Sequence, residues 1–370
     1  MKRALCFAVC AALVALGGCA TSPKKVDVPA SPPANPQAVG KMVQGVQSAK
    51  EASGKERAIQ LLRDAVGGDP GLWEAHYNLG VLLADKGDLN AAERELSQSA
   101  KLAPNAEDVA VGLAEVRRRQ GDANGAIDAL QPFVKQYPDA KVAPIALVTA
   151  LREGGKVKEA IEQGQRVLVY HSSDPYALSD LALSNVELDE IDTAELLIEE
   201  ALKADDKSAV AERTAGLISL RKGDDAVAFK HFQRASELDP KDTTARLNIG
   251  TVLLQAGVYD KAAQEFRAVL AVEPESTDAV LGLAAARRGQ GKKDDQSGFL
   301  EAEKRLLGVL EREPKNVDAT FNLAILYADY LKRPNDATPL LQRFLDEAPK
   351  NHPGRSEAER LLSGVQGVKK

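Results

Sequence analysis

The sequence predicts an all-α protein built as a solenoid of helical hairpins, and three observations lead to this fold class. Prolines recur every 34 residues, alanines keep the same period, and in the unit from 73 to 104 apolar residues follow helical spacing on both sides of Gly87. One hairpin cannot bury its apolar face alone, so successive hairpins must stack around a continuous core. The chain of 370 residues has room for about eight to nine such units.

The period is visible in two residue types. The interval between Pro138 and Pro240 is 102 residues, or three periods, and shorter intervals of 34 residues flank it. The prolines are Pro70, Pro104, Pro138, Pro240 and Pro274, and the alanines are Ala58, Ala92, Ala126, Ala160, Ala194, Ala228 and Ala262.

The unit from 73 to 104 shows how a hairpin is built. Gly87 suits the end of the first helix, and Asp88 can cap the second helix with its carboxylate. We expect the same capping role for Asp122 and Asp224, which also follow a glycine. A proline then closes the second helix, since it cannot continue the hydrogen-bonding pattern.

These marks resemble the tetratricopeptide repeat over residues 39–350. The pattern is clearest in Leu79-Gly80, Ala92, Leu96 and Pro104, in Ala215-Gly216, Ala228, Phe232, Ala235 and Pro240, and in Ile249-Gly250, Ala262, Phe266 and Pro274. The small residues at the eighth and twentieth positions would let the two helices of a hairpin approach closely. The resemblance implies a right-handed superhelical solenoid with a concave groove.

Three segments depart from the regular unit. Residues 39–72 lack the Leu-Gly pair and are expected to form an amino-terminal cap. The seventh unit, from about Thr277, contains about six extra residues in GQGKKDDQSGF. Residues 356–365, within the final segment 351–370, are amphipathic and are expected to form a helix that caps the last unit.

The amino terminus is predicted to be a lipoprotein signal peptide over residues 1–18. Lys2 and Arg3 precede an apolar run that is too short to span a membrane, and Leu16-Gly17-Gly18-Cys19 resembles the lipobox of bacterial lipoproteins. The resemblance implies that Cys19 becomes the lipidated first residue of the mature chain, which would then hold no free thiol. The alternative is an ordinary signal peptide with a chance cysteine.

Residues 19–38 would follow as a lipidated, proline-rich tether. More than one acyl chain gives lasting attachment to a bilayer, so Cys19 would anchor the protein without a transmembrane helix. Ala20, in place of an aspartate, fits the sorting pattern of enterobacterial lipoproteins bound for the outer membrane. We therefore expect an outer-membrane protein that faces the periplasm.

The sequence gives no support to an enzyme. The four histidines lie in different units without metal-ligand spacing, and no glycine loop that could hold a phosphate is present. His76 is expected to serve in packing. We therefore predict no catalytic residues, no metal and no cofactor, and the aromatic content of 4% argues against a small-molecule substrate. The formal charge of −6, or −8 after loss of Lys2 and Arg3, disfavours nucleic acid.

The candidate binding residues are of two kinds. Asparagines occupy the sixth position of three units, and in several tetratricopeptide proteins such an asparagine hydrogen-bonds the backbone of an extended peptide. Arginines lie near the ends of predicted first helices, where they could either complement the helix dipole or form a groove-edge patch for an acidic partner. The residues are Asn78, Asn248 and Asn322, and Arg118, Arg119, Arg152, Arg221 and Arg288. The asparagines could also be consensus residues without a binding role.

The functional hypothesis is a non-enzymatic scaffold that binds envelope proteins or extended peptide segments in its groove. Similar lipoproteins serve in type IV pilus assembly, as adaptors for peptidoglycan enzymes and in myxobacterial gliding motility, so the resemblance implies a part in a cell-envelope machine. The alternative is a regulator of peptidoglycan hydrolases or synthases.

Overall fold

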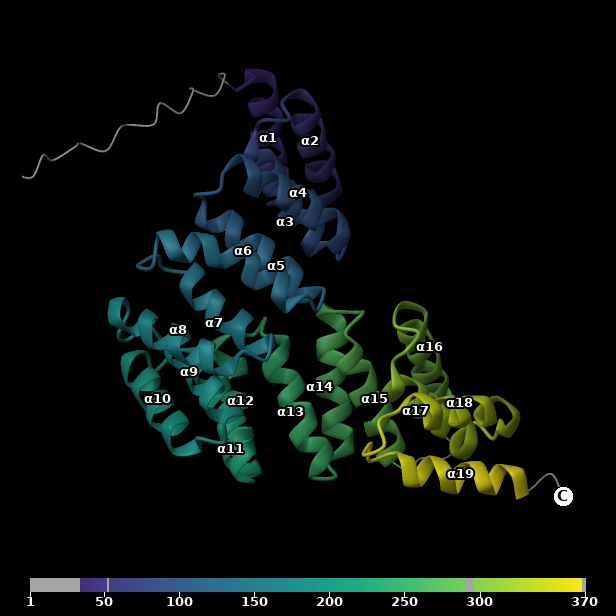
Figure 1. Ribbon diagram of the computed structural model, residues 1–370. Coiled ribbons are helices and arrows are strands. Elements are labelled where there is room, and N and C mark those ends of the chain that lie inside the picture. The colour runs from purple at the N-terminus through teal and green to yellow at the C-terminus, as the bar shows by residue number, and fades with distance from the viewer. Residues whose placement is uncertain (1–33, 52, 291–295, 368–370) are drawn as a thin grey trace, which may run out of the picture.

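The computed structural model describes residues 34–51, 53–290 and 296–367, and these residues form helices joined by short turns, with no β-strand among them (Figure 1). None of the helices in these ranges is long and apolar enough to cross a membrane. The first helices of successive hairpins are α1 (Pro36–Ser48), α3 (Trp73–Asp85), α5 (Glu107–Arg119), α7 (Ala143–Glu153), α9 (Pro175–Glu187), α11 (Ala209–Lys222), α13 (Thr243–Gln255), α15 (Thr277–Gly289) and α17 (Val317–Ile325). The second helices are α2 (Lys55–Gly68), α4 (Leu89–Leu102), α6 (Ala123–Gln136), α8 (Val157–Tyr170), α10 (Ile191–Ala204), α12 (Asp225–Leu238), α14 (Tyr259–Val272), α16 (Gln296–Arg312) and α18 (Pro334–Glu347).

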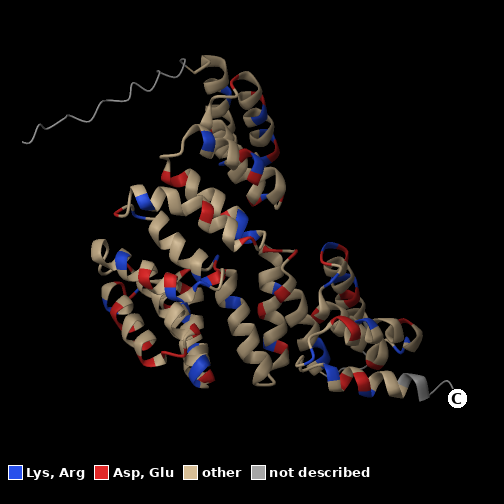
Figure 2. Ribbon diagram, viewed as in Figure 1, with Lys and Arg blue, Asp and Glu red and all other residues tan. Residues whose placement is uncertain are grey.

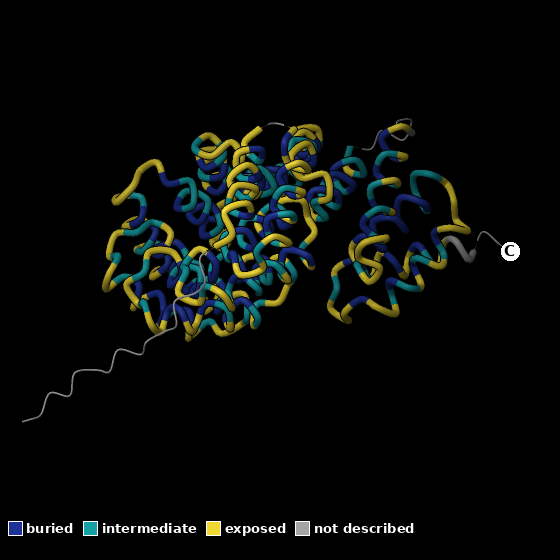
Figure 3. Tube along the Cα trace, turned by 90° about the horizontal axis from the view of Figure 1, so that it is seen from above, coloured by how far each residue is buried: buried dark blue, intermediate teal, exposed yellow. Residues whose placement is uncertain are grey.

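The hairpins stack in chain order. Helix α5, for example, packs on α6 of its own hairpin, on α4 of the preceding hairpin and on α7 of the following one. Buried residues lie where helices meet and exposed residues lie on the outside, as the tube in Figure 3 shows. The predicted all-α solenoid of hairpins is confirmed.

The small residues bring the helices of a hairpin together as expected. A Cβ atom at Gly80 would lie 2.6 Å from Cγ of Leu96, and one at Gly250 would lie 2.8 Å from Cε1 of Phe266. Ala92 is fully buried at the partner position on the second helix. A larger residue at these sites would force the helices apart.

The turn between the two helices contains a left-handed residue in seven of the described hairpins, at the fifteenth position in six of them and one residue later, at Lys332, in the hairpin of α17 and α18. Glycine takes this conformation in five hairpins and avoids the steric penalty of a Cβ atom. Asp189 and Lys332 adopt it without that advantage, with φ of 64° and 55°. The glycines are Gly87, Gly121, Gly155, Gly223 and Gly257.

Two of the three predicted aspartate caps are present. The carboxylate of Asp88 accepts a hydrogen bond from the Ala91 amide at 3.1 Å, and Asp122 accepts one from Gly125 at 2.8 Å. The prediction for Asp224 was wrong, because its side chain makes no capping hydrogen bond to α12. Its carboxylate instead lines a pocket beside Lys222, to which it is electrostatically attracted.

The first hairpin begins earlier and is more regular than expected. Helix α1 starts at Pro36, three residues before the predicted boundary, because Asn35 caps it and proline is pre-organised for a first helical position. Gly45 approaches Leu62 as Gly80 approaches Leu96, so this hairpin keeps the close contact that its missing Leu-Gly pair had obscured. Residues 19–33 of the predicted tether lie outside the described residues.

The irregular carboxyl-terminal hairpins absorb their extra residues in two ways. Helix α16 has 17 residues, against 14 in α14, so part of the insertion lengthens this helix, while residues 291–295 lie outside the described residues. Pro314 and Pro349 are 35 residues apart, one more than the period, and the π-helix Leu326–Tyr330 accommodates the extra residue.

Helix α19 (Arg355–Gly367) packs on α18 at the end of the solenoid. Its Ala358 is fully buried, and Arg355 donates to the carbonyl oxygens of Leu345 and Ala348 at 2.8 and 3.0 Å. The amphipathic run near the carboxyl terminus therefore covers the last hairpin.

Candidate functional site

A hollow on the surface formed by successive first helices contains one of the predicted asparagines. It has a volume of about 360 Å³ and lies between α13 and α15. Gly282 occupies the sixth position of its hairpin, and the absence of a side chain there leaves the ring of Phe266 at the base of the hollow. The lining residues are Thr244, Leu247, Asn248, Thr251, Leu254, Phe266, Asp278, Leu281 and Gly282.

The three predicted asparagines are not equivalent. The side-chain amides of Asn78 and Asn322 donate to the carbonyl oxygens of Glu74 and Asp318, four residues earlier on the same helices, at 2.7 and 2.8 Å. Asn322 is only 9% exposed, and its Oδ1 has no hydrogen-bond partner among the described residues. Asn248 is half-buried, and within the described part of the chain no hydrogen bond engages its side chain, so both its donor and its acceptor are available.

Two of the predicted arginines link consecutive hairpins. Arg118 Nη1 lies 2.5 Å from Oε1 of Glu153, and Arg152 Nη1 lies 3.1 Å from Oε1 of Glu187. Both pairs are separated by 35 residues, so they repeat one contact from hairpin to hairpin. Charges of both signs are accordingly interspersed along the helices (Figure 2). These two guanidinium groups hold neighbouring repeats together.

Asp180 adds a partly buried acid to this network. It occupies the sixth position of its hairpin, where other hairpins carry asparagine, and it accepts a hydrogen bond from Thr149 Oγ1 at 2.6 Å. Burial raises the pKa of its carboxyl group, whereas the Thr149 hydrogen bond and Arg152, 3.9 Å away, act in the opposite direction. Sequence reasoning missed this network, although the spacing of 35 residues between arginine and glutamate was a readable signal.

The other predicted arginines differ from one another. Arg221 forms an ion pair at 3.2 Å with Asp189, which lies in the turn between α9 and α10 of the preceding hairpin, and both side chains are exposed. Arg119 is exposed in the last turn of α5. Arg288 is partly buried, and burial lowers the pKa of its guanidinium group, while Glu357 of α19 counteracts this shift. The arginines therefore do not form one continuous basic patch.

The predictions about metal ions, histidine and lipidation concern other parts of the chain. Within residues 34–51, 53–290 and 296–367, no group of three or more histidine, cysteine or acidic side chains could hold a metal ion. His76 is buried, as expected of a packing residue, and it also makes an ion pair with Glu95. Cys19, the predicted lipidation site, lies outside the described residues.

The repeat pattern also matches known protein families. One tetratricopeptide-repeat model matches residues 56–116 and 219–287, and a second matches residues 111–178 and 293–352, so that together they cover more than half of the chain. The chain belongs to the tetratricopeptide-repeat family. Such repeats generally serve as protein-interaction scaffolds, which supports the predicted class of function at that level.

Several solved structures are similar to this chain to different extents. The APC/C hetero-tetramer Cut9-Hcn1 matches with a TM-score of 0.57 and 16% identity, covering 88% of this tetratricopeptide-repeat chain, which spans 62% of the length of that one. A thermophilic tetratricopeptide-repeat protein of Thermus thermophilus matches with 21% identity, covering 49% of this chain and 99% of its own, at a TM-score of 0.44. Yeast Tom70 matches with 12% identity over 90% and 95% of the two chains, also at 0.44. No curated protein matches the chain.

Proposed function

We propose that this tetratricopeptide-repeat protein is a non-enzymatic scaffold that holds an extended segment of a partner protein in the hollow at Asn248. The observation that carries the proposal is the amide of Asn248, which lies in an open hollow between α13 and α15 and has no hydrogen-bond partner in the part of the chain that the structure describes. A carboxamide both donates and accepts, so it can satisfy the N–H and C=O groups of one residue in an extended peptide.

The surroundings of Asn248 suit a peptide. Leu247, Leu254 and Leu281 line the hollow and offer apolar contacts to the side chains of a bound segment. Gly282 leaves space where a sixth-position side chain would otherwise project. The hollow can therefore accept main chain close to its base while its walls contact alternate side chains.

The proposed location is the periplasmic face of the outer membrane, with attachment through acyl chains on Cys19. The lipobox-like sequence Leu16-Gly17-Gly18-Cys19 supports this part of the proposal. A scaffold held in this way would assemble or stabilise a cell-envelope machine of the motility, pilus or secretion type. Regulation of peptidoglycan hydrolases or synthases is the competing outcome, and the identity of the partner separates the two.

The test is crosslinking in whole cells followed by purification through a carboxyl-terminal tag. Asn248→Ala should abolish recovery of envelope-machine components, whereas the matched control Asn78→Ala should retain them, because the Asn78 amide already donates to its own helix. Undiminished recovery with Asn248→Ala would refute binding at this hollow. Recovery of amidases or penicillin-binding proteins in place of machine components would favour the regulator.

A further inference from the structure

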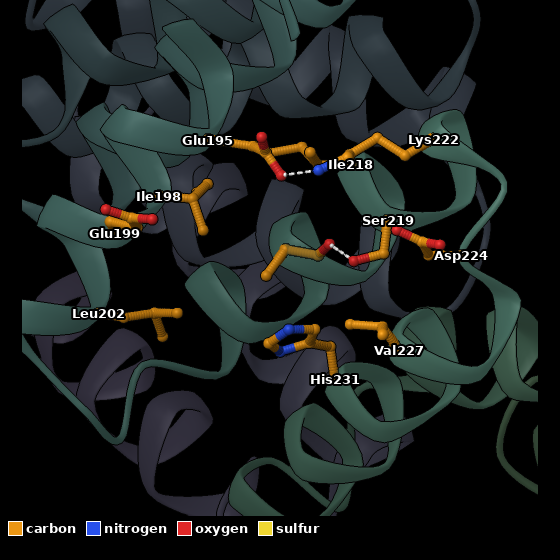
Figure 4. Close-up of a pocket in the computed structure, with 11 residues that line it drawn as sticks. Glu195, Ile198, Glu199, Leu202, Ile218, Ser219, Lys222, Asp224, Val227 and His231 are labelled. Atoms are coloured by element: carbon orange, nitrogen blue, oxygen red, sulfur yellow. Dashed lines mark hydrogen bonds and ion pairs between the residues drawn. The ribbon is translucent and has the colours of Figure 1, made fainter. Parts of the chain in front are cut away.

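A second pocket lies on a different surface, between α10, α11 and α12 (Figure 4). Its volume is about 240 Å³, and it is lined by second helices of two consecutive hairpins, α10 and α12, together with the first helix α11. The hollow at Asn248, in contrast, is formed mainly by the first helices α13 and α15. The lining residues are Glu195, Ile198, Glu199, Leu202, Ala215, Ile218, Ser219, Lys222, Asp224, Val227 and His231.

The pocket exists because two positions of the repeat carry small residues in α11. Ala215 occupies the seventh position and Ser219 the eleventh, one helical turn later on the same face. Every other hairpin from α3 onward has leucine or isoleucine at the seventh position, namely Leu79, Leu113, Leu147, Leu181, Ile249, Leu283 and Leu323. The eleventh position elsewhere holds a side chain larger than serine, namely Leu83, Arg117, Leu151, Asn185, Leu253, Arg287 and Tyr327.

The missing side chains leave an apolar floor. Ile198 and Leu202 from α10 face Ile218 from α11 across the pocket in Figure 4. The Ser219 hydroxyl donates to the Ala215 carbonyl oxygen at 2.9 Å, so its hydrogen-bonding capacity is used within the helix. A cavity of ~150 Å³ lined by apolar side chains is large enough for benzene, and this pocket exceeds that volume. One leucine or phenylalanine side chain therefore fits.

The rim of the pocket is acidic. Lys222 lies 2.5 Å from Glu195, and two further carboxylates, those of Glu199 and Asp224, also line the pocket. His231 is paired with Glu212 of α11, with Nδ1 and Oε2 2.7 Å apart. A positive charge on His231 would therefore be balanced by Glu212 and would not neutralise the carboxylates of the rim. The excess of negative charge at the rim favours a partner that carries a cationic residue beside the side chain that enters the pocket.

We propose that this pocket binds a leucine- or phenylalanine-sized side chain of a partner segment that carries lysine or arginine next to it. The apolar side chain fills the volume that the seventh and eleventh positions leave empty, and the neighbouring cation pairs with Glu199 or Asp224 at the rim. This second binding site is independent of the hollow at Asn248, and either proposal can fail without the other.

The test uses the purified full chain with isotope-labelled isoleucine methyl groups and three synthetic peptides. Acetyl-Lys-Leu-Lys-amide should shift the methyl resonances of Ile198 and Ile218 in a saturable manner, because both side chains line the pocket. Acetyl-Lys-Ala-Lys-amide and acetyl-Glu-Leu-Glu-amide should each bind at least about tenfold more weakly. Equal binding of all three peptides, or no shift at Ile198 and Ile218, would overturn the proposal.

Two pairs of variants link the shifts to the pocket. Ala215→Leu should abolish peptide binding and raise Tm by filling the volume, whereas Ala226→Leu, an exposed position of α12 outside the pocket, should leave binding unchanged. Ser219→Leu serves if Ala215→Leu fails to fold. Glu199→Lys should weaken binding of the lysine peptide, while Glu200→Lys, exposed and outside the lining, should not. Full binding by the filled variants contradicts the assignment.

Discussion

The imidazole of His76 joins the two helices of its hairpin, with Nδ1 lying 2.7 Å from Oε2 of Glu95. The second ring nitrogen lies 3.2 Å from the carbonyl oxygen of Pro70. Both neighbours are acceptors, so the ring satisfies them best as a cation with two N–H donors. The same two positions of the repeat carry charge pairs in two other hairpins, Glu212 with His231 and Arg246 with Glu265, each 19 residues apart.

The His76 pair predicts a pH-dependent stability. The Glu95 hydrogen bond, assisted by Pro70, raises the pKa of His76 above 6.5, although burial opposes the shift. A raised pKa in the folded state means that the stabilisation is complete below about pH 6.5 and is lost as the pH rises through the folded-state pKa. The difference in Tm between wild type and His76→Gln should therefore shrink on going from acidic to alkaline pH. A difference that grows with pH would contradict the charged pair.

Substitution of two helical glycines should have opposite effects. Gly250→Ala places a Cβ atom 2.8 Å from the ring of Phe266, and we expect a loss of about 1–3 kcal/mol in the free energy of unfolding. Gly40→Ala, in α1, meets no heavy atom within 4 Å and should gain about 0.5–1 kcal/mol through higher helix propensity. Urea denaturation measures both, and a neutral Gly250→Ala would show that the two helices can separate without cost.

The contacts between hairpins can be tested with two arginines. The side chain of Arg152 is 17% exposed and pairs with Glu187 near the partly buried Asp180, so Arg152→Ala should lower the free energy of unfolding by about 1–3 kcal/mol. Arg221 pairs with Asp189 at the exposed surface, and Arg221→Ala should change the free energy of unfolding by less than about 0.5 kcal/mol. Equal effects of the two variants on the denaturation midpoint would argue against a structural role for the network of Arg152, Asp180 and Glu187.

Lipidation is tested at Cys19. If the lipobox prediction is correct, Cys19→Ala leaves an unprocessed precursor, because neither acylation nor cleavage after Gly18 can proceed. Mass spectrometry of envelope fractions distinguishes precursor from mature chain. A variant that reaches the outer membrane with the mature mass would refute the prediction.

The fold could be predicted from the sequence because its determinants are local and periodic. Gly87 ends a helix and Pro104 follows one for reasons of backbone geometry, and both signals recur at 34 residues. The hairpin of α1 and α2 was predicted only as a degenerate cap, because the glycine of its close contact, Gly45, lies one residue before the eighth position of the repeat. The π-helix was not predicted either, because a single extra residue in the interval between two prolines does not show where in the repeat it is accommodated.

The binding residues were less predictable because their availability depends on side-chain partners. Asn78 and Asn248 occupy the same position of the repeat, yet only the former donates to its own helix within the described residues. Sequence spacing places a carboxamide on a face of a helix but does not set its rotamer. The pocket at Ala215 could have been found, since it is a departure from the chain's own pattern at the seventh position.

The small residues of α11 also bear on how the molecule would respond to a pulling force. The buried apolar cluster that includes Ile198 and Ile218 is separate from the cluster that includes Phe232 and Ile249. In a stack of repeats, stability is a sum of nearest-neighbour terms, so an extending load is resisted at each interface only by that interface. A chain held at one end by lipid and at the other by a partner would therefore be weakened at α11, where Ala215 and Ser219 offer fewer apolar atoms than the larger residues at the same positions of the other hairpins from α3 onward.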